Sequence, residues 1–504
     1  MDEPEPMDLS EPESEPKDTI TRRKQLLMVE TVREMKLTSM EIQRVTPCYH
    51  VLTGLGRVLR RNEARSYYHL SEPKAKIPQF VSHSWHGGSW KKIAMLLVMK
   101  NGPAAVLTGS FFAFVMVTLS SLGMLPGYER RPVTEMDRTY VFAPWGSCTG
   151  MLVATVVLIL GRPRGLVFLD KICIHQTDKS LTLQGIINIG AFLKNSQSML
   201  VLWDVTYVER LWCMFELAAF LKSCEGGRVK LDIKPTILGP MTILCFVCMF
   251  VLLLVQIPST WDNRLHGLFI WGGINCITML GAVHFWRTFY RQFDSMKTQL
   301  QHFSIDHTTA SCCQVGHVDQ KGRRIPCDKE TLVECIKHWF GSVEEFEQTV
   351  RTNVAATLTA GIGNLAFPYK YLLAAGTPTL WGQADFVASR LREGEFYHAG
   401  ATAIFGLAHW FGAIPFIFAV GALLNYGLRR RYRPCVDAAI PFFVTAVLCL
   451  VAGAGIYGLQ IGLLAIFENM VAASLWATTC TILAIVIVLG APRGTVRAPK
   501  IGDE

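Results

Sequence analysis

The chain has 504 residues, a formal net charge of +9, 50% hydrophobic residues and only 18% charged residues. Soluble proteins carry about 25% charged residues, and the shortfall here falls in apolar runs of roughly 20 residues, the length that crosses a bilayer as a helix. These features exclude a soluble globular enzyme, a disordered protein and a small disulfide scaffold. A basic excess is typical of the cytoplasmic flanks of membrane spans, so we expect the lipid bilayer as a partner and no nucleic acid.

The N-terminal segment, residues 1–22, opens with MDEPEPMDLSEPESEPKD. It is acidic and proline-rich, the reverse of a secretory signal, and it lacks the apolar residues needed to form a core. We therefore expect a disordered acidic tail, followed by a basic helical region over residues 23–78.

Seven clear apolar runs and one weaker run predict eight membrane-spanning helices. The weaker run, Val354–Gly376, contains Asn364, Pro368 and Lys370. In chain order, the expected spans are Pro103–Leu125, Val141–Leu160, Thr236–Ile257, Gly267–Trp286, Val354–Gly376, Ala399–Leu424, Val436–Leu459 and Val471–Ala491.

The distribution of lysine and arginine orients these spans. Four arginines lie between residues 429 and 433, three basic residues follow the last run, and the connection 459–469 has none. Basic residues mark the cytoplasmic side, and those at positions 287, 291 and 297 mark it again after the fourth run. The segments at 287–297 and 429–433 are both cytoplasmic, so an even number of spans must separate them. Ala399–Leu424 is the one clear run between them, and the weaker run Val354–Gly376 is therefore needed as the second span. Both termini are then cytoplasmic.

Residues 79–235 have the pattern of an open parallel α/β sheet that the first two spans interrupt. QFVSHSW (Gln79–Trp85) has a short apolar start before a His/Ser/Trp cluster, as a strand that runs into a loop would have. LVFLDKICIHQ (Leu166–Gln176) begins with a continuous apolar run, and SMLVLW (Ser198–Trp203) has a similar pattern, both typical of buried parallel strands. We expect helices over Leu181–Lys194 and Thr206–Leu221 and a short fourth strand at Lys230–Lys234. Ligands of such sheets bind beyond the carboxyl ends of the strands.

Three of these segments resemble a TIR domain. FVSHSW at Phe80–Trp85, VFLD at Val167–Asp170 and the stretch Met199–Leu217, with its WCxxE motif, are similar to the first strand, the second strand, and the third strand with its following helix. The chain as a whole resembles a set of multipass membrane proteins of dinoflagellate algae that carry the same SHSW, DKxCIxQ and RLWCxxE signatures.

The resemblance implies a candidate site for NAD cleavage. In TIR domains that cleave NAD, the glutamate of WCxxE is catalytic, and it corresponds here to Glu216. A fixed carboxylate would stabilise the oxocarbenium character that develops on the ribose, with Trp212, Cys213 and Phe215 around it. The residues expected to contact a ligand are Ser82, His83, Ser84, Trp85, Asp170, Lys171, His175, Gln176, Trp203, Tyr207 and Trp212.

A structural role for Glu216 is equally compatible with the sequence. It then belongs to an ordinary helix and pairs with Arg210 or Lys222. Many TIR domains act only as self-associating scaffolds. The chain also departs from the enzymatic pattern in its membrane insertion, in the DKICIHQ loop and in the absence of clear later strands before Thr236.

A second module, Ser311–Val350, contains thiols and imidazoles of the types that bind zinc. The paired CxxC knuckles of zinc fingers are missing, so packed thiols with surface histidines are the alternative interpretation. We also expect a hairpin over Val315–Ile325, a helix that is capped by Asp328 and continues to about Phe340, and a capping box at Ser342. The candidate ligands are Cys312, Cys313, His317, Cys327, Cys335 and His338.

The sequence therefore predicts a multipass helical membrane protein with a cytosolic TIR-like domain that signals by self-association. An NAD glycohydrolase acting through Glu216 is the alternative. A channel or transporter is a weaker one, because the spans carry few ionisable residues. The expected divisions are 1–22, 23–78, the split domain 79–100 and 161–235, the hairpin 101–160, spans 236–286, the cysteine module 287–353, spans 354–491 and the basic tail 492–504.

Overall fold

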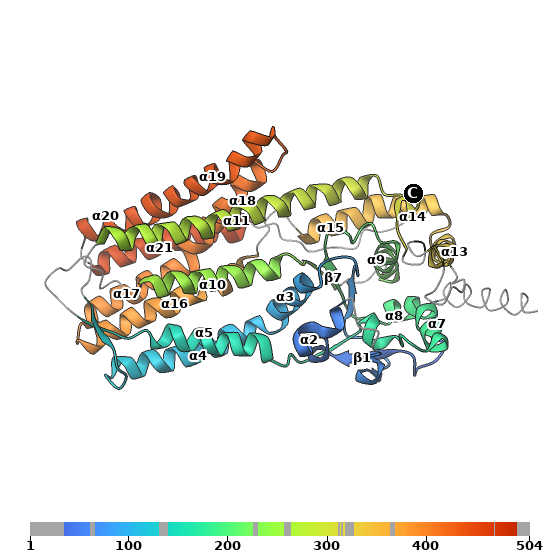
Figure 1. Cartoon of the computed structure of the whole chain (residues 1–504), viewed down its shortest axis with the longest axis horizontal. Helices are drawn as coiled ribbons and strands as arrows, with labels where there is room; N and C mark the ends of the chain where they lie inside the picture. Colours follow the sequence, from blue (N-terminus) through green and yellow to red (C-terminus); the bar gives the residue numbers. More distant parts are fainter. Residues whose placement is uncertain are drawn as a thin grey trace, which may run out of the picture.

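The computed structural model describes residues 35–60, 66–130, 140–224, 230–256, 264–310, 313, 316–317, 327–362, 368–467 and 469–490. Helices gather at one end of an elongated molecule, and a small α/β domain lies at the other end (Figure 1). The two predicted tails, Cys312 and most of the predicted hairpin 315–325 lie outside the described residues.

The α/β domain is built on a parallel sheet with the strand order β3-β7-β8. β3 (Phe80–His83) pairs with β7 (Met199–Trp203), and β7 pairs with β8 (Leu231–Pro235). All residues of β3 and β7 are buried, as expected for strands covered on both faces. The strands predicted within 79–85, 198–203 and 230–234 are therefore present.

The segment that follows the first two long helices returns to the free edge of β3. The N–H of Val81 donates to the carbonyl of Phe168 at 3.0 Å, and the N–H of Phe168 donates to Gln79 O at 2.9 Å. The rings of Phe80 and Phe168 stack with centroids 4.8 Å apart. β6 (Leu166–Val167) thus leads into the edge of this sheet, and the sheet joins segments that lie on both sides of the helical hairpin.

The N-terminal region is less helical than expected. β1 (Arg44–Pro47) pairs antiparallel with β2 (Glu72–Pro73) and with β6. The helix here is α2 (Cys48–Gly56), which is broken at residues 53–55, and two short 3-10 turns follow, η1 (Arg57–Leu59) and η2 (Tyr68–Leu70). The expectation of a basic helical region fails over these residues because β1 is fixed by pairing with a strand that is distant in sequence.

The α/β domain contains the helices α3 (Ser89–Lys100), α6 (Asp170–Cys173), α7 (Lys179–Ile187), α8 (Ile189–Lys194) and α9 (Leu211–Ser223). The helix predicted over 181–194 is interrupted at Asn188. Its side chain accepts from the Thr38 N–H at 2.9 Å and donates to the Thr38 hydroxyl at 2.8 Å. The helix predicted from Thr206 begins at Leu211, because residues 204–210 form a turn.

Four helical stretches of the described chain are long and apolar enough to cross a membrane: Gly102–Ser121, Phe396–Gly427, Pro434–Leu464 and Asn469–Ile487. Large apolar side chains, such as Leu107 and Phe111, project outward from the first of them, as lipid contact requires. These four coincide with four of the eight predicted spans.

The remaining helices at this end are shorter or less apolar. α5 (Trp145–Leu160) and the Leu238–Leu254 part of α10 are the shorter apolar ones. A two-stranded hairpin, β4 (Tyr128–Arg130) with β5 (Tyr140–Phe142), lies between α4 and α5. The helical elements are α4 (Gly102–Ser121), α5, α10 (Leu238–Gln256), α11 (Arg264–Gln301), α16 (Tyr369–Arg392), α17 (Phe396–Ala408), η5 (His409–Ala413), α18 (Ile414–Gly427), α19 (Pro434–Leu450), η6 (Val451–Tyr457), α20 (Gly458–Ile466) and α21 (Asn469–Gly490).

The weak span expected at Val354–Gly376 is not a single helix. α15 is described over Ala355–Ile362, and α16 starts at Tyr369 and extends to Arg392. Pro368 stands at the N-cap of α16, where proline starts a helix more readily than it continues one. The helix in this part of the bundle is therefore displaced toward the C-terminus relative to the prediction.

Asp385 fixes α16 to the start of α5. Its carboxylate accepts from the backbone N–H groups of Gly146 at 2.8 Å and Ser147 at 2.9 Å, and from the Ser147 hydroxyl. Asp385 is fully buried. A carboxylate satisfies the orphan donors at a helix N-terminus and complements its dipole, so this contact docks the hairpin of α4 and α5 on the rest of the bundle.

The long helix α11 extends from the bundle toward the α/β domain (Figure 1). Arg287 and Arg291 on α11 both donate to Asp437 Oδ1 of α19, at 2.8 and 2.5 Å. Arg291 also donates to the carbonyl of Arg429 at 3.0 Å. The basic residues after the fourth predicted span therefore lie beside the arginine-rich connection 428–433.

Beyond α11 the chain forms η3 (Ile305–His307), α13 (Asp328–Phe340), α14 (Val343–Thr349) and η4 (Val350–Val354). α13 packs against α9, and the rings of Trp339 and Phe215 stack at 5.0 Å. The Ser342 hydroxyl accepts from the Glu345 N–H at 3.1 Å, as half of the expected capping box would do. The predicted helix through Phe340 is found, but Cys327 stands at its N-cap and Asp328, the expected cap, is its first residue.

Candidate functional site

The carboxyl ends of β3 and β7 and the start of α6 bring most of the predicted ligand residues to one edge of the sheet. Ser82 and His83 are on β3, Asp170 begins α6, and Tyr207 lies in the turn after β7. Glu216 extends toward them from α9. This is the edge where parallel sheets bind ligands.

Glu216 is hydrogen-bonded to the sheet. The Ser82 hydroxyl donates to Glu216 Oε2 at 2.6 Å, and the Tyr207 hydroxyl lies 2.8 Å from the same serine oxygen. Lys222, one of the two expected partners of Glu216, donates to the carbonyl of Trp339. The half-buried carboxyl therefore joins α9 to β3.

Burial raises the pKa of the Glu216 carboxyl to about 8, although the hydrogen bond from Ser82 opposes that rise and the negative charge of Asp170 adds to it. Desolvation disfavours the charged form of a carboxyl. At pH 7 Glu216 is therefore mainly a neutral acid.

A second group of contacts surrounds Asp170. Its Oδ2 accepts from Trp85 Nε1 at 2.8 Å, and its Oδ1 accepts from the Lys171 N–H at 2.7 Å. The Lys171 ammonium lies 5.3 Å from the centroid of the Trp85 ring, and the His83 ring meets Trp85 edge to face at 4.4 Å. Trp85 thus forms one wall of the edge and is held by a carboxylate.

His83 lies under this wall. It is 6% exposed, and its Nε2 makes no hydrogen bond within the described residues. Burial lowers the pKa of His83, and the positive charge of Lys92 lowers it further while Asp170 opposes the shift. The imidazole is therefore neutral at pH 7.

Three polar residues of this edge, Lys92, Asp204 and Thr206, were not predicted from the sequence. Lys92 is buried in α3 and donates to the carbonyl of Ser84. Asp204 Oδ1 accepts from the Thr206 N–H at 2.9 Å and from its hydroxyl at 2.6 Å, and the hydroxyls of Ser84 and Thr206 lie 2.7 Å apart. Asp204 comes just after its strand, as Asp170 comes just after another strand. This shared position in the sequence could have identified Asp204 as a residue of the edge.

Other predicted ligand residues have local contacts. His175 Nδ1 accepts from the N–H of Asp178 at 2.9 Å, and Gln176 donates to the carbonyl of Ile174 at 2.9 Å. Trp203 is 1% exposed within the core. These side chains shape the loop and the core rather than the edge.

The aromatic residues expected around Glu216 are divided. Trp212 is half-buried and meets Phe215 edge to face at 6.0 Å, while Phe215 stacks on Trp339 of α13. The Cys213 thiol lies 3.6 Å from the carbonyl of His83, and burial raises its pKa well above the usual range. Phe215 is therefore packed against α13 and Cys213 against β3, whereas both were expected to surround the carboxylate of Glu216.

The predicted metal ligands are also divided. The donor atoms of Cys313, His317 and Cys327 all lie within 4.8 Å of one another. Cys335 is 1% exposed and His338 is exposed, both on α13. The structure gathers three of the six predicted ligands into one cluster.

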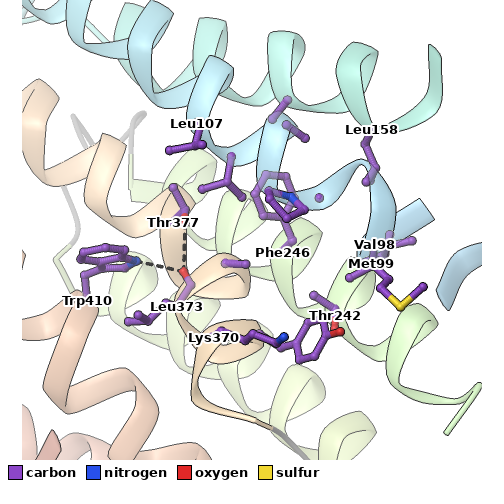
Figure 2. Close-up of a pocket in the computed structure, with 18 residues that line it drawn as sticks. Val98, Met99, Leu107, Leu158, Thr242, Phe246, Lys370, Leu373, Thr377 and Trp410 are labelled. Atoms are coloured by element: carbon purple, nitrogen blue, oxygen red, sulfur yellow. Dashed lines mark hydrogen bonds between the residues drawn. The ribbon is translucent and has the colours of Figure 1, made fainter. Parts of the chain in front are cut away.

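A hollow of about 400 Å³ lies among α3, α4, α5, α10, α16 and η5. Its walls are almost wholly apolar, with Leu107, Leu158 and Phe246 among them, and Lys370 lies at one end (Figure 2). Trp410 closes another side and donates to the carbonyl of Leu373 at 2.9 Å (Figure 2). Walls of this composition favour hydrocarbon groups and disfavour a hydrated ion, because they offer it few polar partners.

Comparison of the chain with protein-family models, with curated proteins and with solved structures gives no match.

Proposed function

We propose that the chain is an integral membrane protein of about eight spans, with both termini in the cytoplasm, whose α/β domain is a TIR-like module that signals by self-association. The observation that carries this proposal is the direct continuity between the sheet and the bundle. β3 continues through α3 into α4, α5 returns into β6, and β8 leads straight into α10. A displacement in the bundle is thereby transmitted to three strand segments at once.

The contact between α3 and α10 strengthens this coupling. A Cβ atom placed on Gly239 of α10 would lie 2.2 Å from the backbone N of Met95 on α3. Two backbones packed this closely move together, since packed interiors transmit strain. α3 and α10 therefore pack as one unit.

The orientation is supported by the placement of positive charge. Arg287 and Arg291 lie beside the connection 428–433, where Arg291 contacts the carbonyl of Arg429. Basic residues that gather at one level of a helical bundle are typical of its cytoplasmic side. The α/β domain then lies in the cytoplasm together with them.

The state of Glu216 favours a scaffold over a hydrolase. Nicotinamide leaves NAD as a neutral molecule, so cleavage needs an anionic carboxylate near the ribose rather than a proton donor. Glu216 is mainly neutral at pH 7 and is hydrogen-bonded to Ser82 at 2.6 Å. Its geometry suits a link between α9 and β3.

Trp90 is the side chain that we assign to self-association. It is 60% exposed, and it lies at the start of α3, just after the loop that follows β3. Tryptophan is enriched at protein interfaces and at their energetic centres. Trp90 thus presents an exposed aromatic side chain close in sequence to the SHSW motif.

Light scattering of the purified full-length protein in detergent tests this assignment. We expect a concentration-dependent rise in mass that Trp90→Ser abolishes. Met40→Ser, which changes another exposed apolar residue, should leave the rise intact. A protein that remains monomeric at high concentration, or a rise that persists in Trp90→Ser, would contradict the proposal.

NAD cleavage is the second candidate, because Glu216 reaches the ligand edge beside Ser82 and Tyr207. Nicotinamide release from NAD, followed at high protein concentration, tests it with Glu216→Ala and Glu216→Gln as controls. Since only the anion can act, release should increase as pH rises through about 8. Release that is absent, or equal in wild type and both variants, excludes this candidate.

A further inference from the structure

The cluster of Cys313, His317 and Cys327 has the dimensions of a metal site. The two sulfur atoms lie 3.8 Å apart, and all three donor atoms lie within 4.8 Å of one another. The residues come from the segment after η3 and from the N-cap of α13. They therefore join two pieces of chain that no described strand pairing holds together.

The separation of the two sulfurs distinguishes zinc coordination from a disulfide. With zinc–sulfur bonds of about 2.3 Å, two corners of a tetrahedron lie about 3.8 Å apart. A disulfide requires about 2.05 Å between sulfurs. The observed 3.8 Å matches the first arrangement.

His317 provides an independent indication. Its Nε2 is buried and makes no hydrogen bond within the described residues. Its backbone φ is +57°, a conformation that costs energy in a residue other than glycine and that collects at functional sites. A buried imidazole nitrogen without a hydrogen bond is costly, and a metal ion would remove the cost.

Cys335 does not belong to this cluster. It is 1% exposed on α13 and is packed as a buried thiol.

We propose that Cys313, His317 and Cys327 bind one zinc ion through two sulfurs and one imidazole nitrogen, with a fourth position taken by water or another donor. Zinc prefers this borderline-soft set of ligands. The ion would fasten the segment after η3 to the start of α13, and α13 supports α9 through the stacked rings of Trp339 and Phe215. The inference does not depend on the proposed function.

Metal analysis of the full-length protein, purified in detergent with a reductant, tests the site. We expect one zinc per chain by plasma mass spectrometry, and charge-transfer absorption from thiolate to metal after exchange with cobalt(II). Cys313→Ser and Cys327→Ser should each abolish the tight binding, and His317→Gln should weaken it at least tenfold. His338→Gln and Cys224→Ser, which lie outside the cluster, should bind as the wild type does.

Far-ultraviolet circular dichroism establishes that each variant is folded, so that loss of metal reports on ligation. Full zinc occupancy in the folded Cys327→Ser variant would overturn the proposal. A wild-type protein that takes up no zinc or cobalt would overturn it as well. A disulfide between Cys313 and Cys327, found by alkylation and mass spectrometry in protein prepared without oxygen, would also overturn it.

Discussion

Ser82 of β3 and Glu216 of α9 share a hydrogen bond of 2.6 Å although 134 residues separate them. The two lie on opposite sides of the helical hairpin in sequence. The two residues meet because the chain leaves β3, passes through the hairpin of α4 and α5, and then returns to the sheet before it forms α9. It places an ionisable group at the joint between the first strand and the helix of the WCxxE motif.

Glu216→Gln should change how the stability of the protein depends on pH. The pKa of Glu216 is about 8 in the folded protein and about 4.3 when unfolded. The folded state therefore holds the extra proton, and stability falls as pH rises from about 5 to about 8. The loss is at most about 1.4 kcal/mol per pH unit.

Thermal unfolding in detergent at pH 5.5 and pH 8.5 measures this effect. Glutamine is neutral and still accepts a hydrogen bond from Ser82, so the variant should lose less stability than the wild type over this interval. Equal losses in both proteins would show that Glu216 is already ionised in the fold.

Asp385→Ala should loosen the hairpin of α4 and α5. The change leaves the N–H groups of Gly146 and Ser147 without their acceptor, at a cost of about 1–3 kcal/mol for each unsatisfied buried group. Asp385→Asn keeps one acceptor oxygen and should cost clearly less. Thermal unfolding of both variants in one detergent provides the comparison, and an alanine variant as stable as the wild type would contradict the docking role.

Asp437→Asn should destabilise the contact between α11 and α19. Arg287, whose side chain is 5% exposed, would lose its carboxylate and remain buried, which costs about 2 kcal/mol or more. Asp294→Asn removes a more exposed pair with Arg429 at 2.7 Å and should cost less than about 1 kcal/mol. Denaturation midpoints that rank the two variants in the opposite order would be incompatible with this assignment.

Gly239→Ala should force α3 and α10 apart, because the new methyl group would meet the backbone of Met95. Gly281→Ala on α11 is the matched control, since no atom lies within 4 Å of the position that its new methyl group would take. We expect a large loss of stability, and loss of self-association, only in the first variant. Equal stability and equal self-association of the two variants would contradict the coupling between the sheet and the bundle.

Features that depend on local pattern were predictable from the sequence. The strand at 199–203 follows from a continuous apolar run, the strand at 80–83 from a short apolar start before a polar cluster, and a short strand was expected at Lys230–Lys234, where β8 lies. The helix that ends at Phe340 was predicted, with its N-cap one residue too late, at Asp328 instead of Cys327. In each case neighbouring residues already determine the element.

Features that depend on distant partners were not predictable. β1 exists because it pairs with β6, and the break at Asn188 exists because Thr38 satisfies its side chain. α16 contains polar residues, and its part after Gly376 was therefore not predicted as a helix of the bundle. One of them, Asp385, is accommodated by partners on α5, which are distant in sequence. At the sheet edge, the sequence located Ser82 and Glu216, but only the fold shows that they bind each other.

The adjacency of β3 and the segment after β6 is the central claim, and photo-crosslinking tests it most directly. An azidophenylalanine placed at Phe168 in the full-length protein should crosslink to peptides that contain Phe80, whose ring stacks at 4.8 Å, and Phe192, at 5.2 Å. Mass spectrometry of the digested product locates the link. Crosslinks to lipid or to the bundle helices, with none to the peptide 79–83, would contradict a sheet that closes across the hairpin.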